Sequence, residues 1–200
     1  MRTLAQIISV VLQPLFIPLY GMLLLFYLPM YRMFYTFNQK MFIFGGVALF
    51  TAVIPLLIIL QLIKLKKVKD FFIADKNERT LPYVVCFFCY LLCAVFLWWI
   101  NIDFWVVNVM FGATLSLVLL MAVNFFWKIS AHMSGIGGLC GAIFAGSILM
   151  FANPVSLFAV ILLLSGVLAS SRIYLKAHTL GQTCGGFFLG FCCTFIFALL

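Results

Sequence analysis

The chain has 200 residues, of which 67% are hydrophobic and only 8% are charged. This composition excludes a soluble globular domain, because such domains average about 25% charged residues. The net charge of +8 does not indicate nucleic-acid binding, since the basic residues gather in the few breaks between apolar segments. We therefore expect an integral membrane protein that has the lipid bilayer, and no nucleic acid, as its partner.

Seven apolar segments follow one another along the chain. Their approximate ranges are 4–30, 41–63, 82–100, 104–127, 134–151, 155–172 and 180–200. Each is close to or above the roughly 18–20 residues that a helix needs to cross a bilayer, and none alternates like a strand of an outer-membrane barrel. The sequence predicts an all-α, polytopic transmembrane helical bundle that forms a single integral membrane domain over residues 1–200.

The first segment differs from the others because it contains Pro14 and Pro18. It is too long for a signal peptide and lacks a small-residue cleavage site, so we expect a first span that is bent or interrupted at these prolines. A re-entrant first segment is the alternative. The prediction is therefore six or seven spans.

Basic residues are unequally shared between the two membrane faces. With seven spans, Arg32 and Lys40 fall on one face and the ten others on the opposite face. The positive-inside rule would make the richer face cytoplasmic, although several of these residues could instead bind an anion. We expect a multi-pass protein of a bacterial cytoplasmic membrane, and the face that carries the site stays open.

Two sets of small residues have packing or functional interpretations. Among seven cysteines, Cys86 and Cys89 have a redox-like spacing but no second pair, so we expect no metal and no cofactor. Glycines collect at 135–146 and at 181–190, which predicts close packing of the fifth and seventh segments. Alternatively, the glycines after His132 bring backbone N–H groups to a bound anion.

The two histidines, His132 and His178, are the strongest candidates for chemistry. Two spans separate Arg79 from His132, and two more separate His132 from His178, so all three breaks lie at one membrane face. Imidazole acts as a nucleophile or a general acid near neutral pH. Arginine and lysine bind phosphate oxygens. Together with Arg172, these residues predict a phosphate site at the membrane interface.

At these positions the chain resembles the type 2 phosphatidic acid phosphatase superfamily. Ser171-Arg172, five residues and His178 are similar to the family's third motif, and Gly186 is similar to its trailing glycine. Ile129-Ser130-Ala131-His132 resembles the second motif, and the 76–82 segment resembles the first. Gln182 stands where the family has an aspartate that orients the nucleophilic histidine.

The resemblance implies a membrane lipid phosphatase or pyrophosphatase with a phosphohistidine intermediate and no metal. His178 would be the nucleophile, His132 the general acid, and Gln182 the residue that orients His178. The residues implied for phosphate binding are Arg172, Arg79, Lys76, Ser130 and Ser171. Asp75 is a candidate to replace the missing aspartate. The site would open sideways to a phosphorylated lipid.

Two other functions stay open at this point. A catalytically impaired relative could bind phosphorylated lipids without hydrolysing them, because Gln182 supplies no charge. A metal-dependent intramembrane transferase could use Asp70, Asp75 and Glu78 to bind a metal-diphosphate. The sequence names neither the particular lipid phosphate nor the oligomeric state.

Overall fold

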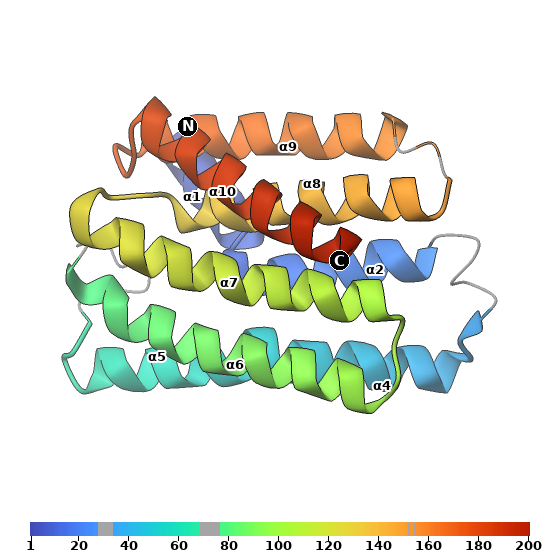
Figure 1. Cartoon of the computed structure of the whole chain (residues 1–200). Coiled ribbons are helices and arrows are strands. Elements are labelled where there is room, and N and C mark those ends of the chain that lie inside the picture. Colours follow the sequence, from blue (N-terminus) through green and yellow to red (C-terminus); the bar gives the residue numbers. More distant parts are fainter. Residues whose placement is uncertain (28–33, 69–76, 152, 154) are drawn as a thin grey trace.

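The computed structural model describes residues 1–27, 34–68, 77–151, 153 and 155–200. All secondary structure in this part of the chain is helical, and seven segments are long and apolar enough to cross a membrane. Figure 1 shows these segments lying side by side as a bundle. The prediction of an all-α membrane protein is therefore confirmed. Of the two predicted span numbers, six and seven, the described residues contain seven candidate spans.

The first segment is interrupted at Pro14, as predicted. It consists of α1 (Arg2–Val11), the 3₁₀ turn η1 (Pro14–Phe16) and α2 (Ile17–Tyr27). Pro14 has no N–H to donate to Val10, and the Gln13 N–H donates to the Val10 carbonyl instead. The prediction of a break at Pro18 was wrong, because Pro18 is the second residue of α2, where no intrahelical N–H bond is needed.

The second segment remains continuous despite Pro55. It contains α4 (Phe37–Ala48), a π-helical turn η2 (Leu49–Val53) and α5 (Ile54–Lys64). The Ile54 N–H donates to the Leu49 carbonyl, five residues back. One wide π-helical turn therefore accommodates Pro55, which has no N–H to donate, and the helix does not break.

Five long helices complete the bundle: α6 (Thr80–Trp99), α7 (Phe104–Phe126), α8 (Ala131–Leu149), α9 (Val155–Tyr174) and α10 (Leu180–Leu199). The short 3₁₀ turn η3 (Asn77–Arg79) leads into α6. The sequence prediction began the fifth span at residue 134, whereas α8 begins three residues earlier because Ser130 caps it. His132 therefore lies in the first turn of α8 rather than in a polar break.

Glycines hold α8 and α10 in close contact. A Cβ atom at Gly137 would clash with the Phe187 carbonyl, and one at Gly190 would clash with the Ser134 carbonyl. Gly112 of α7 approaches the backbone of α10 in the same way, because a Cβ there would lie 2.7 Å from the Cys193 carbonyl oxygen. The predicted packing role of the glycines is confirmed. Gly135 and its neighbours lie past the first turn of α8, so their N–H groups belong to the helix interior.

The seven cysteines are all unpaired. Five of them are buried inside the bundle, and Cys184 and Cys192 are exposed on α10. Cys86, Cys93 and Cys140 pack in apolar clusters. These side chains therefore serve as small apolar residues.

Candidate active site

Three connections gather at one end of the bundle, as the alternation of the spans predicts. Figure 1 shows the start of α6, the α7–α8 connection and the α9–α10 connection at the same end. Their polar residues are nearly inaccessible: Arg79, Ser130, His132, Arg172 and His178 are each at most 8% exposed. Burial of so many polar groups in an apolar protein marks this end as the candidate site.

The turn after α9 brings His178 back to Arg172. Lys176 adopts φ 54°, and the Lys176 and Ala177 N–H groups donate to the carbonyls of Ile173 and Arg172 at 2.9 and 3.0 Å. This is the Schellman pattern of a helix C-terminus. The His178 N–H also points to the Arg172 carbonyl, at 3.4 Å. The five-residue spacing between Arg172 and His178 is thus the length of this turn.

A single amide oxygen positions the His178 ring. Thr179 and Gln182 form a capping box at the start of α10, in which the Thr179 N–H donates to Oε1 of Gln182 at 3.1 Å. The same Oε1 lies 3.2 Å from Nδ1 of His178. Because a backbone N–H can only donate, the shared atom is the amide oxygen. Nδ1 of neutral His178 therefore carries the hydrogen, and Nε2 keeps a free lone pair.

The surroundings of His178 keep its imidazole neutral. Burial, with the positive charges of Arg79 and Arg172, lowers the pKa of His178 from 6.5 to about 3. Lys128 acts in the same direction, whereas the hydrogen bond to Gln182 favours the protonated ring. A neutral imidazole with an unprotonated Nε2 is the form that attacks an electrophile.

Two buried guanidinium groups supply positive charge beside His178. Arg79 donates from a terminal nitrogen to the Ile129 carbonyl at 3.2 Å, which ties the start of α6 to the α7–α8 connection. Arg172 is 3% exposed, and within the described part of the chain its Nε has no hydrogen-bond acceptor. An unpartnered buried N–H on a cation is costly. A bound anion would satisfy it.

Ser130 has a structural role that motif reasoning missed. It is fully buried, and its Oγ accepts from the Met133 N–H as the N-cap of α8. Its own N–H points to the Gln182 carbonyl at 3.3 Å. Ser130 thus joins the α7–α8 connection to α10 while its hydroxyl hydrogen stays available for a ligand.

His132 is held by the broken first segment. Its Nε2 lies 3.1 Å from the Ser9 carbonyl and 3.2 Å from Oε1 of Gln13. The Ser9 carbonyl is available because the break at Pro14 diverts the Gln13 N–H to Val10. A carbonyl only accepts, so Nε2 of neutral His132 carries the hydrogen, and Nδ1 is the nitrogen left for proton exchange.

Ser9 and Gln13 are site residues that the sequence interpretation missed. The signal was present, because both are polar residues in an apolar segment and lie four positions apart, the spacing that would put two side chains on one face of a helix. Only their contact with His132, more than a hundred residues away, shows what that face does.

The remaining predicted phosphate-binding residues are placed differently. Ser171 is buried, but its hydroxyl donates to the Val167 carbonyl of its own helix at 2.8 Å. Its role in phosphate binding stays a prediction. Lys76 and Asp75 lie outside the described residues, as does Asp70.

The site thus combines a nucleophile-competent imidazole, a second imidazole on another helix and two buried guanidinium groups. Comparison of the chain with known protein families, with curated proteins and with solved structures finds no match.

Proposed function

We propose that this protein is a membrane lipid phosphatase or pyrophosphatase in which His178 forms a phosphohistidine. The observation that carries the proposal is the hydrogen bond between Nδ1 of His178 and Gln182, which leaves Nε2 unprotonated beside Arg79 and Arg172. The motif resemblance to the type 2 phosphatidic acid phosphatase superfamily supports the same function, and we propose that the chain is a member of this superfamily.

In the first step Nε2 of His178 attacks phosphorus, and the bond from phosphorus to the leaving oxygen breaks. Protonated His132 transfers its proton to that oxygen, and the lipid alcohol or lipid phosphate leaves with this proton on its oxygen. Arg79 and Arg172 bind the other phosphoryl oxygens and the charge that develops on them.

In the second step water attacks the phosphorus of the phosphohistidine. His132, now neutral, takes one proton from the water, and the nitrogen–phosphorus bond breaks. Inorganic phosphate leaves, and His178 returns to the neutral form with its hydrogen on Nδ1. Both histidines end in their starting states, so the cycle balances.

Gln182 also supports a second candidate, a protein that binds lipid phosphates without hydrolysing them. Its amide orients His178 but supplies no charge to stabilise the cationic phosphohistidine. The third possibility, a metal-dependent transferase, draws no support from the described residues, because two of its three acids, Asp70 and Asp75, lie outside them.

Phosphate release from a panel of lipid monophosphates and diphosphates tests the proposal. Purified wild-type protein in detergent with EDTA should release phosphate and acquire an acid-labile, alkali-stable phosphoryl label. His178→Ala should lose both, and Cys184→Ala, at an exposed position of α10, should keep both. Intact lipid binding without release would favour the binding protein, and release abolished by EDTA would favour the metal-dependent enzyme.

A further inference from the structure

The start of α6 buries a tyrosine hydroxyl that the proposed mechanism does not use. Tyr83 lies in the first turn of α6 and is 8% exposed. Its hydroxyl has no hydrogen-bond partner among the described residues. The hydroxyl of a buried tyrosine usually finds such a partner, because a buried polar group without one destabilises the protein. A ligand that hydrogen-bonds to this hydroxyl would remove that penalty.

Tyr83 follows Arg79 by one helical turn. The backbone of Arg79 is already helical, with φ −80° and ψ −23°, and side chains four positions apart are neighbours on a helix surface. The Tyr83 hydroxyl lies close to the Arg79 guanidinium, but the two groups do not complete a hydrogen bond. A guanidinium can only donate, so Arg79 offers this hydroxyl no acceptor. The hydroxyl hydrogen therefore stays available to a ligand.

A second buried donor without an acceptor belongs to the same site. Arg79 and Arg172 both lie near His178, whose pKa their positive charges lower. Nε of Arg172 has no acceptor in the part of the chain that the structure describes. The Tyr83 hydroxyl and this Nε thus accompany the two guanidinium groups beside the proposed nucleophile. One phosphoryl group has three terminal oxygen atoms, which are enough to accept from both donors.

The buried face of α6 is directed toward the segment that holds His132. Tyr90 follows Tyr83 by seven positions, which places both on one face of the helix. The Tyr90 hydroxyl donates to the Pro14 carbonyl at 3.0 Å. Pro14 follows Gln13, whose amide contacts His132. Tyr83 therefore faces the interior of the bundle, and it does so at the end where the candidate site lies.

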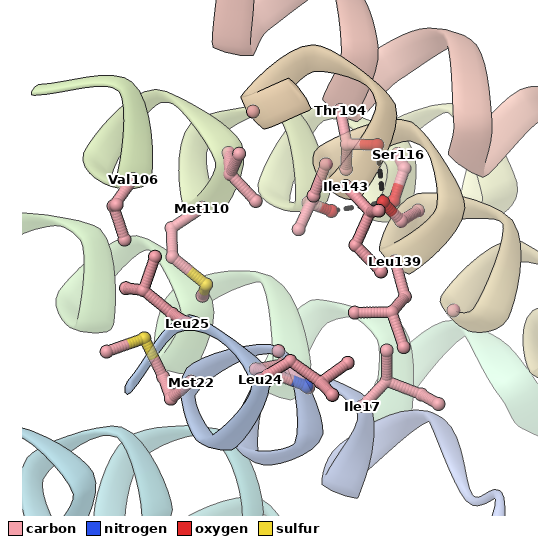
Figure 2. Close-up of a pocket in the computed structure, with 18 of the residues that line it drawn as sticks. Ile17, Met22, Leu24, Leu25, Val106, Met110, Ser116, Leu139, Ile143 and Thr194 are labelled. Carbon is pink, nitrogen blue, oxygen red and sulfur yellow. Dashed lines mark hydrogen bonds between the residues drawn. The ribbon is translucent and has the colours of Figure 1, made fainter. Parts of the chain in front are cut away.

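The large apolar cavity between α2, α7 and α8 does not supply the missing partner. Its volume is about 540 Å³, and Figure 2 shows Leu25, Met110 and Ile143, one from each of these helices, around its open centre. Tyr90 lines this cavity, whereas Tyr83, two turns nearer the site, does not. The Tyr83 hydroxyl is therefore associated with the charged end of the bundle rather than with the apolar cavity.

We infer that Tyr83 is a further phosphate-binding residue, whose hydroxyl donates to a terminal oxygen of the phosphoryl group held by Arg79 and Arg172. The inference rests on the proposed phosphate site and adds a neutral donor to its two cations. Negative charge develops on this oxygen when His178 attacks phosphorus. Tyrosine hydroxyls stabilise developing oxyanions in this way.

Tyr83→Phe tests the inference because it removes only the hydroxyl. The matched control is Tyr174→Phe, since Tyr174 ends α9 at the same end of the bundle and is 57% exposed. The probe is inorganic phosphate, and its affinity is measured from the rise in melting temperature of the full-length protein at constant ionic strength. We expect Tyr83→Phe to weaken phosphate binding about tenfold or more, as for a hydrogen bond to a charged group, and Tyr174→Phe to leave it unchanged.

The melting temperature without phosphate separates ligand binding from a structural role. A hydroxyl that bonds only to a ligand does not stabilise the ligand-free protein, so Tyr83→Phe should melt no lower than the wild type. A lower melting temperature than that of Tyr174→Phe would overturn the inference, because it would show that the hydroxyl has a partner within the protein.

The same substitution in an Arg79→Lys background separates direct contact from positioning of the guanidinium. A hydroxyl that binds the phosphate itself should cause a further loss of affinity in this background. No further loss would make Tyr83 a support for Arg79 and would overturn the inference.

Phosphate release from a lipid monophosphate is measured in parallel. Phosphate binding that depends on Tyr83, without release from any lipid, would remove the phosphatase and keep Tyr83 as a ligand. Release that needs His178 but not Tyr83 would keep the phosphatase and remove Tyr83 from the site. Unchanged affinity in Tyr83→Phe, or no phosphate binding by the wild type, would also overturn the inference.

Discussion

Oε1 of Gln182 lies 3.2 Å from Nδ1 of His178 and 3.1 Å from the Thr179 nitrogen. One amide oxygen thus caps α10 and orients the candidate nucleophile. The superfamily in which we propose to place the chain has an aspartate here, so we expect the proposed activity to be most sensitive to substitution at this position.

Gln182→Glu should increase the rate of phosphate release. Glutamate has the length of glutamine and suits the third position of a capping box, so α10 should remain capped. Changing a carboxylate to an amide costs about 10⁴ in a catalytic triad, and we expect the reverse change to raise kcat/KM by at least about tenfold. Gln182→Met, which cannot accept the hydrogen bond, should lower it. An unchanged rate in both variants would show that this contact is not catalytic.

Protonation of His178, the proposed nucleophile, should cause no fall in kcat/KM near pH 6. Because burial and the positive charges of Arg79 and Arg172 lower the pKa of His178 to about 3, Nε2 stays unprotonated from pH 8 down to about pH 4. The measurement is kcat/KM against pH. A loss of kcat/KM below a midpoint near pH 6.5, with a midpoint that Gln182→Glu moves to higher pH, would contradict this expectation.

Because the pKa of His178 is low in the folded protein, the free energy of unfolding should decrease as the pH falls. Below about pH 6.5 the unfolded chain binds a proton at His178, whereas the folded protein does not until about pH 3. Stability from this group is therefore complete above pH 6.5 and declines toward pH 3 by about 1.4 kcal/mol per pH unit. Melting temperatures of the wild type and His178→Gln, measured in detergent from pH 8 to 4, should converge with acid. Parallel curves would refute this.

Gln13→Met should lower kcat more than it changes KM. Gln13 contacts His132, the proposed general acid, so its loss should disturb proton transfer rather than binding, by about tenfold for one hydrogen bond. A shifted pH optimum would separate this effect from simple misfolding. Gln61→Met, at an exposed position of α5, is the control and should behave like the wild type.

Gly190→Ala should destabilise the protein by about 1–3 kcal/mol, the range for overpacking. Its Cβ would clash with the Ser134 carbonyl, forcing α8 and α10 apart. Gly45→Ala, where a Cβ meets nothing within 4 Å, should be neutral or slightly stabilising through helix propensity. Thermal unfolding of both variants in one detergent provides the comparison. Equal melting temperatures would mean that the helices relax around the methyl group.

Apolar segment length and proline positions predict most of the fold. All seven span ranges agree with the helices to within a few residues, and the fifth begins earlier than predicted, at Ala131, because Ser130 caps α8. At the candidate site, motif spacing singled out His132, His178, Arg172 and Gln182. It could not find Ser9 and Gln13, because their contact with His132 joins distant parts of the chain.

The sequence by itself determined that this is an all-helical membrane protein and that His132, His178, Arg79 and Arg172 lie at one end of the bundle, because hydrophobic length and the alternation of spans are local properties. Only the tertiary structure decided which imidazole nitrogen is free on each histidine, and that Nε of Arg172 has no acceptor in the part of the chain that the structure describes. These features depend on the distances between helices, and the glycine contacts that set those distances form only when the bundle packs.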